Sequence, residues 1–300
     1  MSNPFAWSYY SVELKPGVVA PGIYPDTLPM LPRMLLRGVN VAGMECLDVG
    51  TMEGLIPVLL AKQKAARVVA TDADTHCAEK LAMVKHLHGV EFEHVTQRHA
   101  YDMQAQFPTG GFDLINLSGL LYHVVSPLMV LQGIRPLLKR NALMIVSTNV
   151  TTQPGYSAEF NAKGRLQQEP NTFWYPTVQL LDYWFQMLNL TPIECLFMPH
   201  TAVQAPGYLF EKRSGYVSVL VQACDTTAAF DPWMGRACST SWEMTRLTDW
   251  ERVRTQPESK ITHSYQPLST SLHIAVNNYA PITTAKDHHD SHLLLLGDAH

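Results

Sequence analysis

The pattern of apolar and polar positions predicts alternating strands and helices from Glu45 to about Cys224. Short, mostly apolar runs alternate with longer stretches of helical periodicity, which is typical of a parallel sheet with helices on both faces. Strands are predicted at 45–49, 67–71, 90–95, 112–117, 142–148, 190–197 and 216–223, and helices at 54–64, 75–87, 127–139 and 178–188. The predicted fold class is therefore α/β, a doubly wound sheet.

The two ends of the chain follow a different pattern. Residues 1–43 contain an extended segment at 8–14, turn signals, and a candidate short helix at 28–36, which Pro32 would interrupt unless it lay in the first turn. Periodicity weakens over 225–300. We therefore expect an N-terminal cap (1–43), a central domain (44–224) with a lid-like insertion at 151–176, and a C-terminal extension (225–300) with a mobile tail.

Composition and charge bear on which class of binding partner is expected. The 300 residues are 46% hydrophobic, and the formal net charge is -4. Basic residues are scattered, whereas a nucleic-acid binder normally presents a basic face, so a small-molecule substrate is favoured over a nucleic acid. The extension is a candidate contact for a homo-oligomer.

Several further features bear on location and metals. No apolar run approaches the length of about 18 residues needed for a transmembrane helix, and the N-terminus lacks a signal-peptide pattern. The five cysteines are odd in number and widely spaced, so we expect a reducing cytoplasm rather than a disulfide framework. His288, His289 and His292 have no fixed scaffold, and no metal site is predicted.

The segment from Glu45 to Gly54 is the most informative motif. It predicts a buried strand, a glycine turn and a helix, and the next strand ends at Asp72. Gly50 and Gly54 allow a ligand to approach the backbone, and an acid at that strand end can accept hydrogen bonds from ribose hydroxyls. The alternatives are an ordinary strand-to-helix turn and an acid that caps the next helix.

Four pieces of sequence carry a resemblance to a known family. They are Leu47-Asp48-Val49-Gly50-Thr51-Met52-Glu53-Gly54, Val69-Ala70-Thr71-Asp72, Tyr101-Asp102-Met103 and Ser118-Gly119-Leu120-Leu121-Tyr122-His123-Val124-Val125-Ser126-Pro127. Over roughly residues 7–223 the chain resembles the class I S-adenosylmethionine-dependent methyltransferases, and in particular the branch of tRNA wobble-uridine carboxymethyl/methyl transferases and related small-molecule enzymes. The resemblance implies a Rossmann-like sheet and S-adenosylmethionine as cofactor.

The same resemblance implies a cofactor-binding set of nine residues. They are Asp48, Gly50, Thr51, Gly54, Asp72, Asp74, Asp102, Met103 and Ser118. Asp48 would lie near the cofactor's amino group, Asp72 and, as a second choice, Asp74 at the ribose, and Asp102 and Met103 at the adenine. Each has a structural alternative: Asp48 as a turn cap, Asp74 as a helix N-cap, and Asp102 as a loop acid.

On the acceptor side we single out Tyr122, His123, Glu169 and Tyr175 as candidate catalytic residues. His123 follows the fourth strand and is a candidate general base; the alternative is a histidine that hydrogen-bonds the backbone and shapes the cofactor pocket. Tyr175, with Trp174, is a candidate aromatic cage for a sulfonium or an element of the core. Glu169 is a candidate rim acid or a solvated loop carboxylate.

The sequence thus predicts methyl transfer from S-adenosylmethionine to a small metabolite. Three alternatives stay open. The first is a tRNA-modifying transferase, whose relatives carry extra basic residues. The second is an enzyme that cyclises S-adenosylmethionine itself and releases methylthioadenosine, and the third is a non-catalytic cofactor-binding protein.

Overall fold

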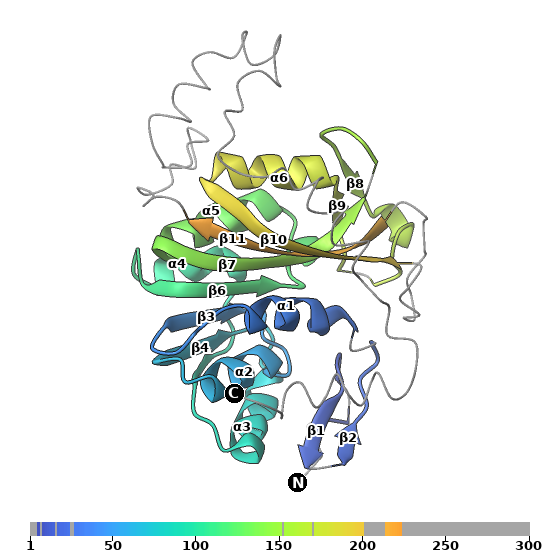
Figure 1. Cartoon of the computed structure of the whole chain (residues 1–300). Helices are drawn as coiled ribbons and strands as arrows, with labels where there is room; N and C mark the ends of the chain where they lie inside the picture. Colours follow the sequence, from blue (N-terminus) through green and yellow to red (C-terminus); the bar gives the residue numbers. More distant parts are fainter. Residues whose placement is uncertain are drawn as a thin grey trace.

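A seven-stranded sheet forms the centre of the molecule (Figure 1). The computed structural model describes residues 5–200, apart from positions 7, 16, 25, 26, 152 and 170, and residues 214–223. The strands lie in the order β10-β11-β7-β6-β3-β4-β5. Their bounds are β3 Glu45–Val49, β4 Arg67–Thr71, β5 Glu93–Val95, β6 Phe112–Ser118, β7 Leu138–Thr151, β10 Leu190–Pro199 and β11 Ser214–Ala223. The strands from β3 to β7 pair in parallel, and β11 runs antiparallel to both neighbours. The predicted fold class is confirmed.

Helices cover both faces of this sheet (Figure 1). They are α1 Thr27–Arg37, α2 Leu55–Lys62, α3 Cys77–His88, α4 Met103–Gln106, α5 Pro127–Ile134 and α6 Val178–Met187. One face packs against α4, α5 and α6, and the other against α1, α2 and α3. Buried residues alternate between these clusters along a strand: Val219 and Val221 of β11 face the first, and Leu220 faces the second. The sequence therefore reads as near-continuous apolar strands, because both faces are covered.

Some boundaries differ from the sequence-based expectation. The helix predicted at 127–139 ends at Ile134, and a 3-10 turn, Arg135–Leu137, leads into β7. Pro136 explains the early end, since proline cannot continue the hydrogen-bond ladder of a helix. The helix predicted at 28–36 exists as α1 with Pro32 inside it.

Two hairpins were not predicted. β1 (Val12–Lys15) and β2 (Val18–Ala20) pair within the N-terminal segment, and β8 (Ala158–Phe160) pairs with β9 (Trp174–Pro176) inside the insertion. The domain boundaries stay predictions, because residues 225–300, with the tail histidines, lie outside the described part. None of the described helices has the length and apolar character needed to cross a membrane.

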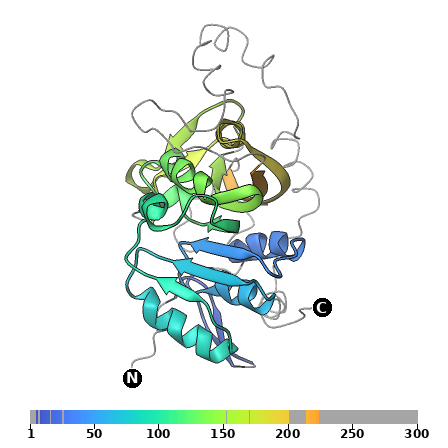
Figure 2. The same cartoon turned by 90° about the vertical axis from the view of Figure 1, so that its left-hand side faces the viewer.

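The parallel strands give the sheet two distinct edges. Figure 2 shows the arrowheads of β3, β4 and β5 at one edge, the carboxyl edge. The strand order reverses next to β3, because the chain proceeds outward through β4 and β5 on one side and through β6 and β7 on the other. In open α/β sheets, ligands bind outside the carboxyl ends at such a switch point. The fold therefore predicts a ligand site at the ends of β3, β4 and β6.

Candidate functional site

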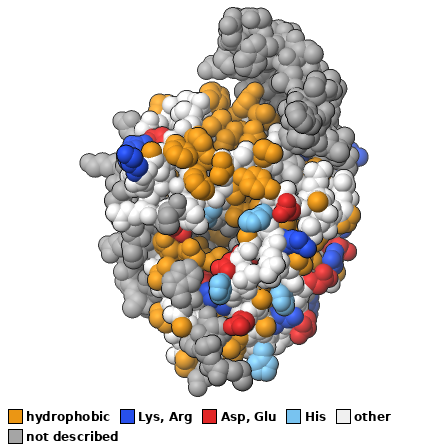
Figure 3. Space-filling view, turned by 180° about the vertical axis from the view of Figure 1, so that it is seen from behind, with side chains coloured by type: hydrophobic (Ala, Val, Ile, Leu, Met, Phe, Trp, Pro, Cys, Tyr) orange, Lys and Arg blue, Asp and Glu red, His pale blue; other side chains and the backbone are white. Residues whose placement is uncertain are grey.

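A cavity of ≈ 440 Å³ lies at the carboxyl edge, above the ends of β3, β4 and β6. Its size falls in the range of small-molecule pockets, about 300–1,000 Å³. Figure 3 shows this side as a hollow bordered by acidic and histidine side chains, below a broad group of apolar side chains. Three segments far apart in the sequence form its walls: the N-terminal tyrosines, the strand ends, and the insertion before β9.

The turn after β3 has the geometry that its glycines predict. Gly50 has a φ of 79° and lines the cavity together with Leu120, whose side chain packs against it. Gly54 has a φ of 76°, but it faces α3: a Cβ there would lie 2.7 Å from Leu81 Cδ2. Gly50 thus exposes backbone to a ligand, whereas Gly54 lets α2 begin close to α3 and is absent from the cavity wall.

Asp72, at the end of β4, is buried and lines the cavity. Its Oδ2 accepts a hydrogen bond from the Met52 amide and its Oδ1 accepts one from the Asp74 amide, both at 2.9 Å. These bonds fix the carboxylate against the turn. Because each carboxylate oxygen has two acceptor positions, one on each oxygen is left to accept from a ligand diol.

Asp48, at the end of β3, is also buried against the cavity. Asn116 of β6 donates a 2.6 Å hydrogen bond to its Oδ1. Burial raises the pKa of Asp48 to about 6, and the bond from Asn116 opposes that rise. A cationic group bound beside Asp48 would favour the ionised carboxylate.

A row of hydroxyls extends from Asn116 across the sheet. Ser118 Oγ donates to Asn116 Oδ1 at 2.7 Å and lies 2.9 Å from Ser147 Oγ, which lies 2.7 Å from Ser218 Oγ. Ser118, Ser147 and Ser218 are register partners on β6, β7 and β11. Ser118 therefore lines the cavity as part of a buried polar row that fixes the Asn116 amide.

The opposite wall is built around Glu169. Tyr9 Oη donates to Glu169 Oε1 at 3.0 Å, and Tyr24 Oη and Gln167 Nε2 donate to Oε2 at 3.2 and 2.8 Å. The rings of Tyr9 and Tyr24 stack with centroids 5.5 Å apart. Burial and the Glu169 charge raise the pKa of Tyr24 to about 12, so this phenol stays a donor. Glu169 thus joins the insertion to the N-terminal segment over the cavity.

A buried ion pair holds Tyr9 in place. Glu53, in the turn before α2, accepts hydrogen bonds through Oε1 from Lys80 Nζ and from the Tyr9 amide, both at 2.9 Å. Glu53 is fully buried and Lys80 nearly so. Removal of one partner from such a pair is strongly destabilising. The position of Tyr9 therefore depends on the same turn that carries Gly50.

His123 and Tyr122 complete the wall between these two sides. His123 Nδ1 lies 3.0 Å from the Asn171 carbonyl oxygen. A carbonyl only accepts, so Nδ1 carries the proton and Nε2 is the basic nitrogen of the neutral ring. Burial lowers the pKa of His123 below its ordinary value, which favours that neutral ring. Tyr122 is buried and packs edge-on against Tyr216, which also lines the cavity.

Besides Gly54, four candidate residues lie away from the cavity wall. Asp102 is exposed at the end of a 3-10 turn, whereas Met103 is buried in the core, where its sulfur accepts from Thr71 Oγ1 at 3.7 Å. Tyr175 is buried beneath the insertion and donates to Gln167 Oε1 at 2.9 Å. Trp174 donates to the Val125 carbonyl. Tyr175 is thus buried and Trp174 half-buried, and neither lines the cavity; their role in an aromatic cage stays a prediction.

The remaining candidates line the cavity. Asp48, Gly50, Thr51, Asp72, Asp74, Ser118, Tyr122, His123 and Glu169 all contribute to its wall. Several lining residues were missed by sequence reasoning: Tyr24, His99, Asn116 and Tyr216. Asn116 sits two residues before Ser118 on a strand whose end was predicted at the site, so the alternation of side chains could have indicated it.

The charge of the cavity is one-sided. Asp48, Asp72, Asp74 and Glu169 line it, and no lysine or arginine does so among the described residues. Nor do three histidine, cysteine, aspartate or glutamate side chains gather as a metal site there or elsewhere in the described part of the chain. A cavity lined by carboxylates and tyrosines suits a cationic or neutral ligand.

These features describe an α/β protein with a cavity of ligand size at the switch point of its sheet. A family model described as "Methyltransferase domain" matches residues 27–194, more than half of the chain. The chain belongs to this methyltransferase family, as the sequence motifs indicated, and its cofactor is S-adenosylmethionine. The site fits that cation, because Gly50 exposes backbone and buried Asp48 and Asp72 supply fixed acceptors.

Known proteins show the extent of the likeness. A tRNA U34 carboxymethyltransferase from Pseudomonas syringae pv. tomato is 25% identical over 168 residues, which cover 55% of this chain and 51% of the relative. A related enzyme from Pseudomonas savastanoi pv. phaseolicola is 24% identical over the same length. The chain spans about half the length of the curated relatives it matches.

Among solved structures, the [4+2]-cyclase SpnF shares the fold with a TM-score of 0.52 at 12% identity, covering 64% of this chain and 80% of that one. The 1,6-didemethyltoxoflavin-N1-methyltransferase of Burkholderia thailandensis, solved with its substrate and S-adenosylhomocysteine, gives 0.50 at 17% identity, covering 65% and 78%. At these identities the likeness shows a shared fold.

Proposed function

We propose that this protein transfers the methyl group of S-adenosylmethionine to a small molecule bound in the same cavity. The observation that carries the proposal is the division of the cavity into two walls. One wall, with Asp48, Gly50 and Asp72, has fixed acceptors for a nucleoside cofactor. The other, with Tyr122, His123 and Glu169, offers a base and polar contacts to a second ligand.

The proposed roles follow from the contacts. Asp72 accepts from the ribose hydroxyls through the positions that the Met52 and Asp74 amides leave open. Asp48 lies beside the cofactor's amino group. The cofactor supplies an electrophilic methyl on a sulfonium, and the protein must hold a nucleophile in line with it. His123 Nε2 receives a proton from the acceptor, because Nδ1 is committed to the Asn171 carbonyl.

The charge of the site favours a small acceptor over tRNA. Phosphate contacts from lysine and arginine supply much of the affinity for nucleic acids. Among the described residues, none of these side chains lines the cavity. The likeness to tRNA U34 carboxymethyltransferases therefore supports the cofactor half of the proposal and leaves the acceptor to be settled by experiment.

Isothermal titration calorimetry with S-adenosylhomocysteine tests the cofactor half. We expect wild-type protein to bind and Asp72→Asn to bind about 100-fold more weakly, because two hydrogen bonds to a charged acceptor are lost. Glu93→Gln is the matched control, since Glu93 is an exposed acid at the opposite edge of the sheet. Equal affinities of wild type and Asp72→Asn would refute the assignment of this wall.

Product analysis tests the acceptor half. The protein is incubated with S-adenosylmethionine and either the small-molecule or the RNA fraction of a cell extract, and nucleoside products are identified by mass spectrometry. We expect S-adenosylhomocysteine with the small-molecule fraction. Its formation with the RNA fraction instead would favour a tRNA-modifying enzyme, and methylthioadenosine formed from cofactor alone would favour cyclisation. His123→Asn should lower kcat by about 100-fold, within the range for a lost general base.

A further inference from the structure

Glu169 lines the cavity but lies outside the cofactor wall, the wall with Asp48, Gly50 and Asp72 that is proposed to bind the cofactor. Asp48, Asp72 and Asp74 come from the ends of β3 and β4, whereas Glu169 comes from the insertion on the opposite side. A half-buried carboxylate is costly without a complementary charge. Its described partners are two phenols and an amide, all neutral. The negative charge therefore remains in the cavity.

We infer that the acceptor is a primary or secondary amine whose ammonium form binds to Glu169. A carboxylate has about four acceptor positions. Tyr9, Tyr24 and Gln167 occupy three of them, which leaves one for an N–H of the ligand. The stacked rings of Tyr9 and Tyr24 lie beside this position, and aromatic rings attract cations. This inference rests on the proposed function and adds the class of substrate.

Tyr101 on the cavity wall, and exposed apolar side chains outside that wall, indicate an apolar body on that amine. Tyr101, which is 43% exposed, lines the cavity, and its hydroxyl accepts from the Ser126 amide at 2.8 Å. The adjacent Val125 is 70% exposed, and its carbonyl accepts from Trp174, whose ring packs edge-on against the exposed Phe160. Apolar side chains also form a surface beside the hollow in Figure 3. An amine with an aromatic or alkyl body would bury part of it.

The chemistry balances with the groups present. The bound ammonium gives one proton to His123 Nε2 and becomes a neutral amine. Its nitrogen lone pair attacks the methyl carbon of S-adenosylmethionine, a C–N bond forms, and the electron pair of the broken C–S bond stays on sulfur. The products are the methylated ammonium and S-adenosylhomocysteine, and His123 releases its proton to solvent.

The test measures binding to the protein saturated with S-adenosylhomocysteine. Three matched probes, benzylammonium, benzyl alcohol and benzoate, are titrated by calorimetry. We expect benzylammonium to bind at least tenfold more tightly than benzyl alcohol, and benzoate to bind most weakly. In Glu169→Gln the preference for the ammonium should vanish. Glu159→Gln is the matched control, because Glu159 lies on β8 of the same insertion and pairs with Arg165 instead of lining the cavity.

The outcomes separate this inference from the proposed function. If wild-type protein does not bind S-adenosylhomocysteine, the proposed function is wrong and the inference falls with it. If it binds but shows no preference for the ammonium, or keeps that preference in Glu169→Gln, only the inference is wrong. A selective loss of S-adenosylmethionine over S-adenosylhomocysteine affinity in Glu169→Gln would assign the carboxylate to the sulfonium and also overturn it. Should that variant unfold, the ranking of the three probes on wild type decides.

Discussion

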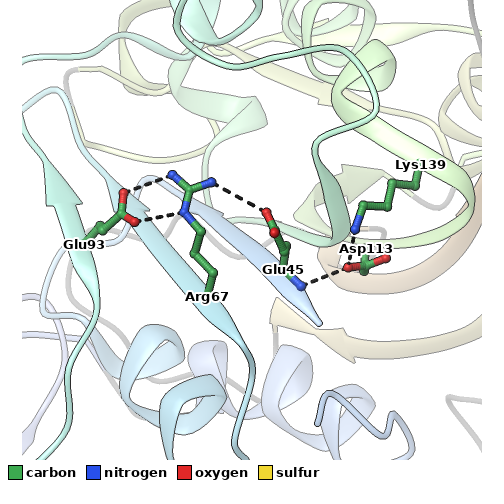
Figure 4. Close-up of polar contacts among 5 residues, drawn as sticks. All are labelled: Glu45, Arg67, Glu93, Asp113 and Lys139. Carbon is green, nitrogen blue, oxygen red and sulfur yellow. Dashed lines mark hydrogen bonds and ion pairs between the residues drawn. The ribbon is translucent and has the colours of Figure 1, made fainter. Parts of the chain in front are cut away.

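The two edges of the sheet use the same residue types in opposite ways. At the amino edge, Arg67 of β4 pairs with Glu93 of β5 at 2.8 Å and with Glu45 of β3 at 3.6 Å. Lys139 of β7 pairs with Asp113 of β6 at 2.7 Å, and Asp113 also accepts from the Glu45 amide at 2.9 Å (Figure 4). Each acid there has a cation or an amide beside it, and two cations, Arg67 and Lys139, partly offset the three acids within the protein.

At the carboxyl edge, Asp48, Asp72 and Glu169 have neutral partners, whereas Glu53 in the adjacent turn pairs with Lys80. Asp48 is held by Asn116, Asp72 by two backbone amides, and Glu169 by two tyrosines and a glutamine. Neutral donors fix a carboxylate in position without cancelling its charge. The ion pairs at the amino edge therefore contribute to stability, whereas the carboxyl edge keeps a negative charge that a cationic ligand can neutralise.

The largest expected effect comes from a cation placed at the carboxyl edge. Leu120→Lys would put an ammonium against Gly50, where the Leu120 side chain now packs. Like charges about 4 Å apart repel by about 4 kcal/mol near a protein surface, so affinity for S-adenosylmethionine should fall by 100-fold or more. S-adenosylhomocysteine, which lacks the sulfonium, should lose less.

Leu120→Met controls for the change of shape, because this swap conserves apolar volume. It should keep both affinities within about twofold. Calorimetry with the two nucleosides provides the measurement, and thermal melts confirm that both variants fold. Equal losses of the two ligands in Leu120→Lys would show that shape and not charge governs this wall.

The sequence predicted several residues that line the cavity at the ends of β3 and β4, because its signals there are local. The strand ending at Val49, the glycine after it and the acid ending β4 lie within one βαβ unit, where chain order dictates proximity. The opposite wall depends on contacts between residues 160 and 145 positions apart, Tyr9 and Tyr24 with Glu169. No periodicity encodes such pairs.

Residues of the insertion show the same limit. Tyr175 and Glu169 lie six positions apart and looked equally suitable as site residues. The β8–β9 pairing buries Tyr175, whereas Glu169 reaches the cavity. That hairpin depends on the register of Ala158 with Pro176, which the local pattern did not indicate. The side of a short strand that faces the core is thus decided by pairing, and only the structure supplied it.

An intermediate effect is expected from pH. Burial raises the pKa of Asp48 from 3.8 to about 6, so the folded protein without ligand binds this proton more tightly than the unfolded chain does. The resulting contribution to the free energy of unfolding, up to about 3 kcal/mol, is fully present below a pH of about 4 and is lost as the pH rises through about 6. Binding of the cofactor's ammonium has the opposite dependence, because it needs the carboxylate. Affinity for S-adenosylhomocysteine should rise by up to about tenfold between pH 5 and pH 7 and level off above that range.

Calorimetry across this range, in buffers of equal ionic strength, measures the dependence. Asp48→Asn should bind more weakly and show a flat profile, whereas Glu45→Gln, an acid at the other end of the same strand, should keep the wild-type slope. A slope retained in Asp48→Asn would assign the titration to another group.

The smallest effect is expected at the amino edge, where the acids already have cationic partners. Arg67→Met removes the ion pairs to Glu93 and Glu45, whose side chains are well exposed. Exposed pairs each contribute about 0.2–1 kcal/mol, so unfolding free energy should fall by about 1 kcal/mol and be less affected at high salt. Denaturant unfolding measures this change, with Arg37→Met in the last turn of α1 as control.

Affinity for S-adenosylhomocysteine should not change, because the pairs lie at the edge opposite the cavity. A loss of affinity comparable to that of Asp72→Asn would mean that the two edges are energetically coupled and do not have separate roles.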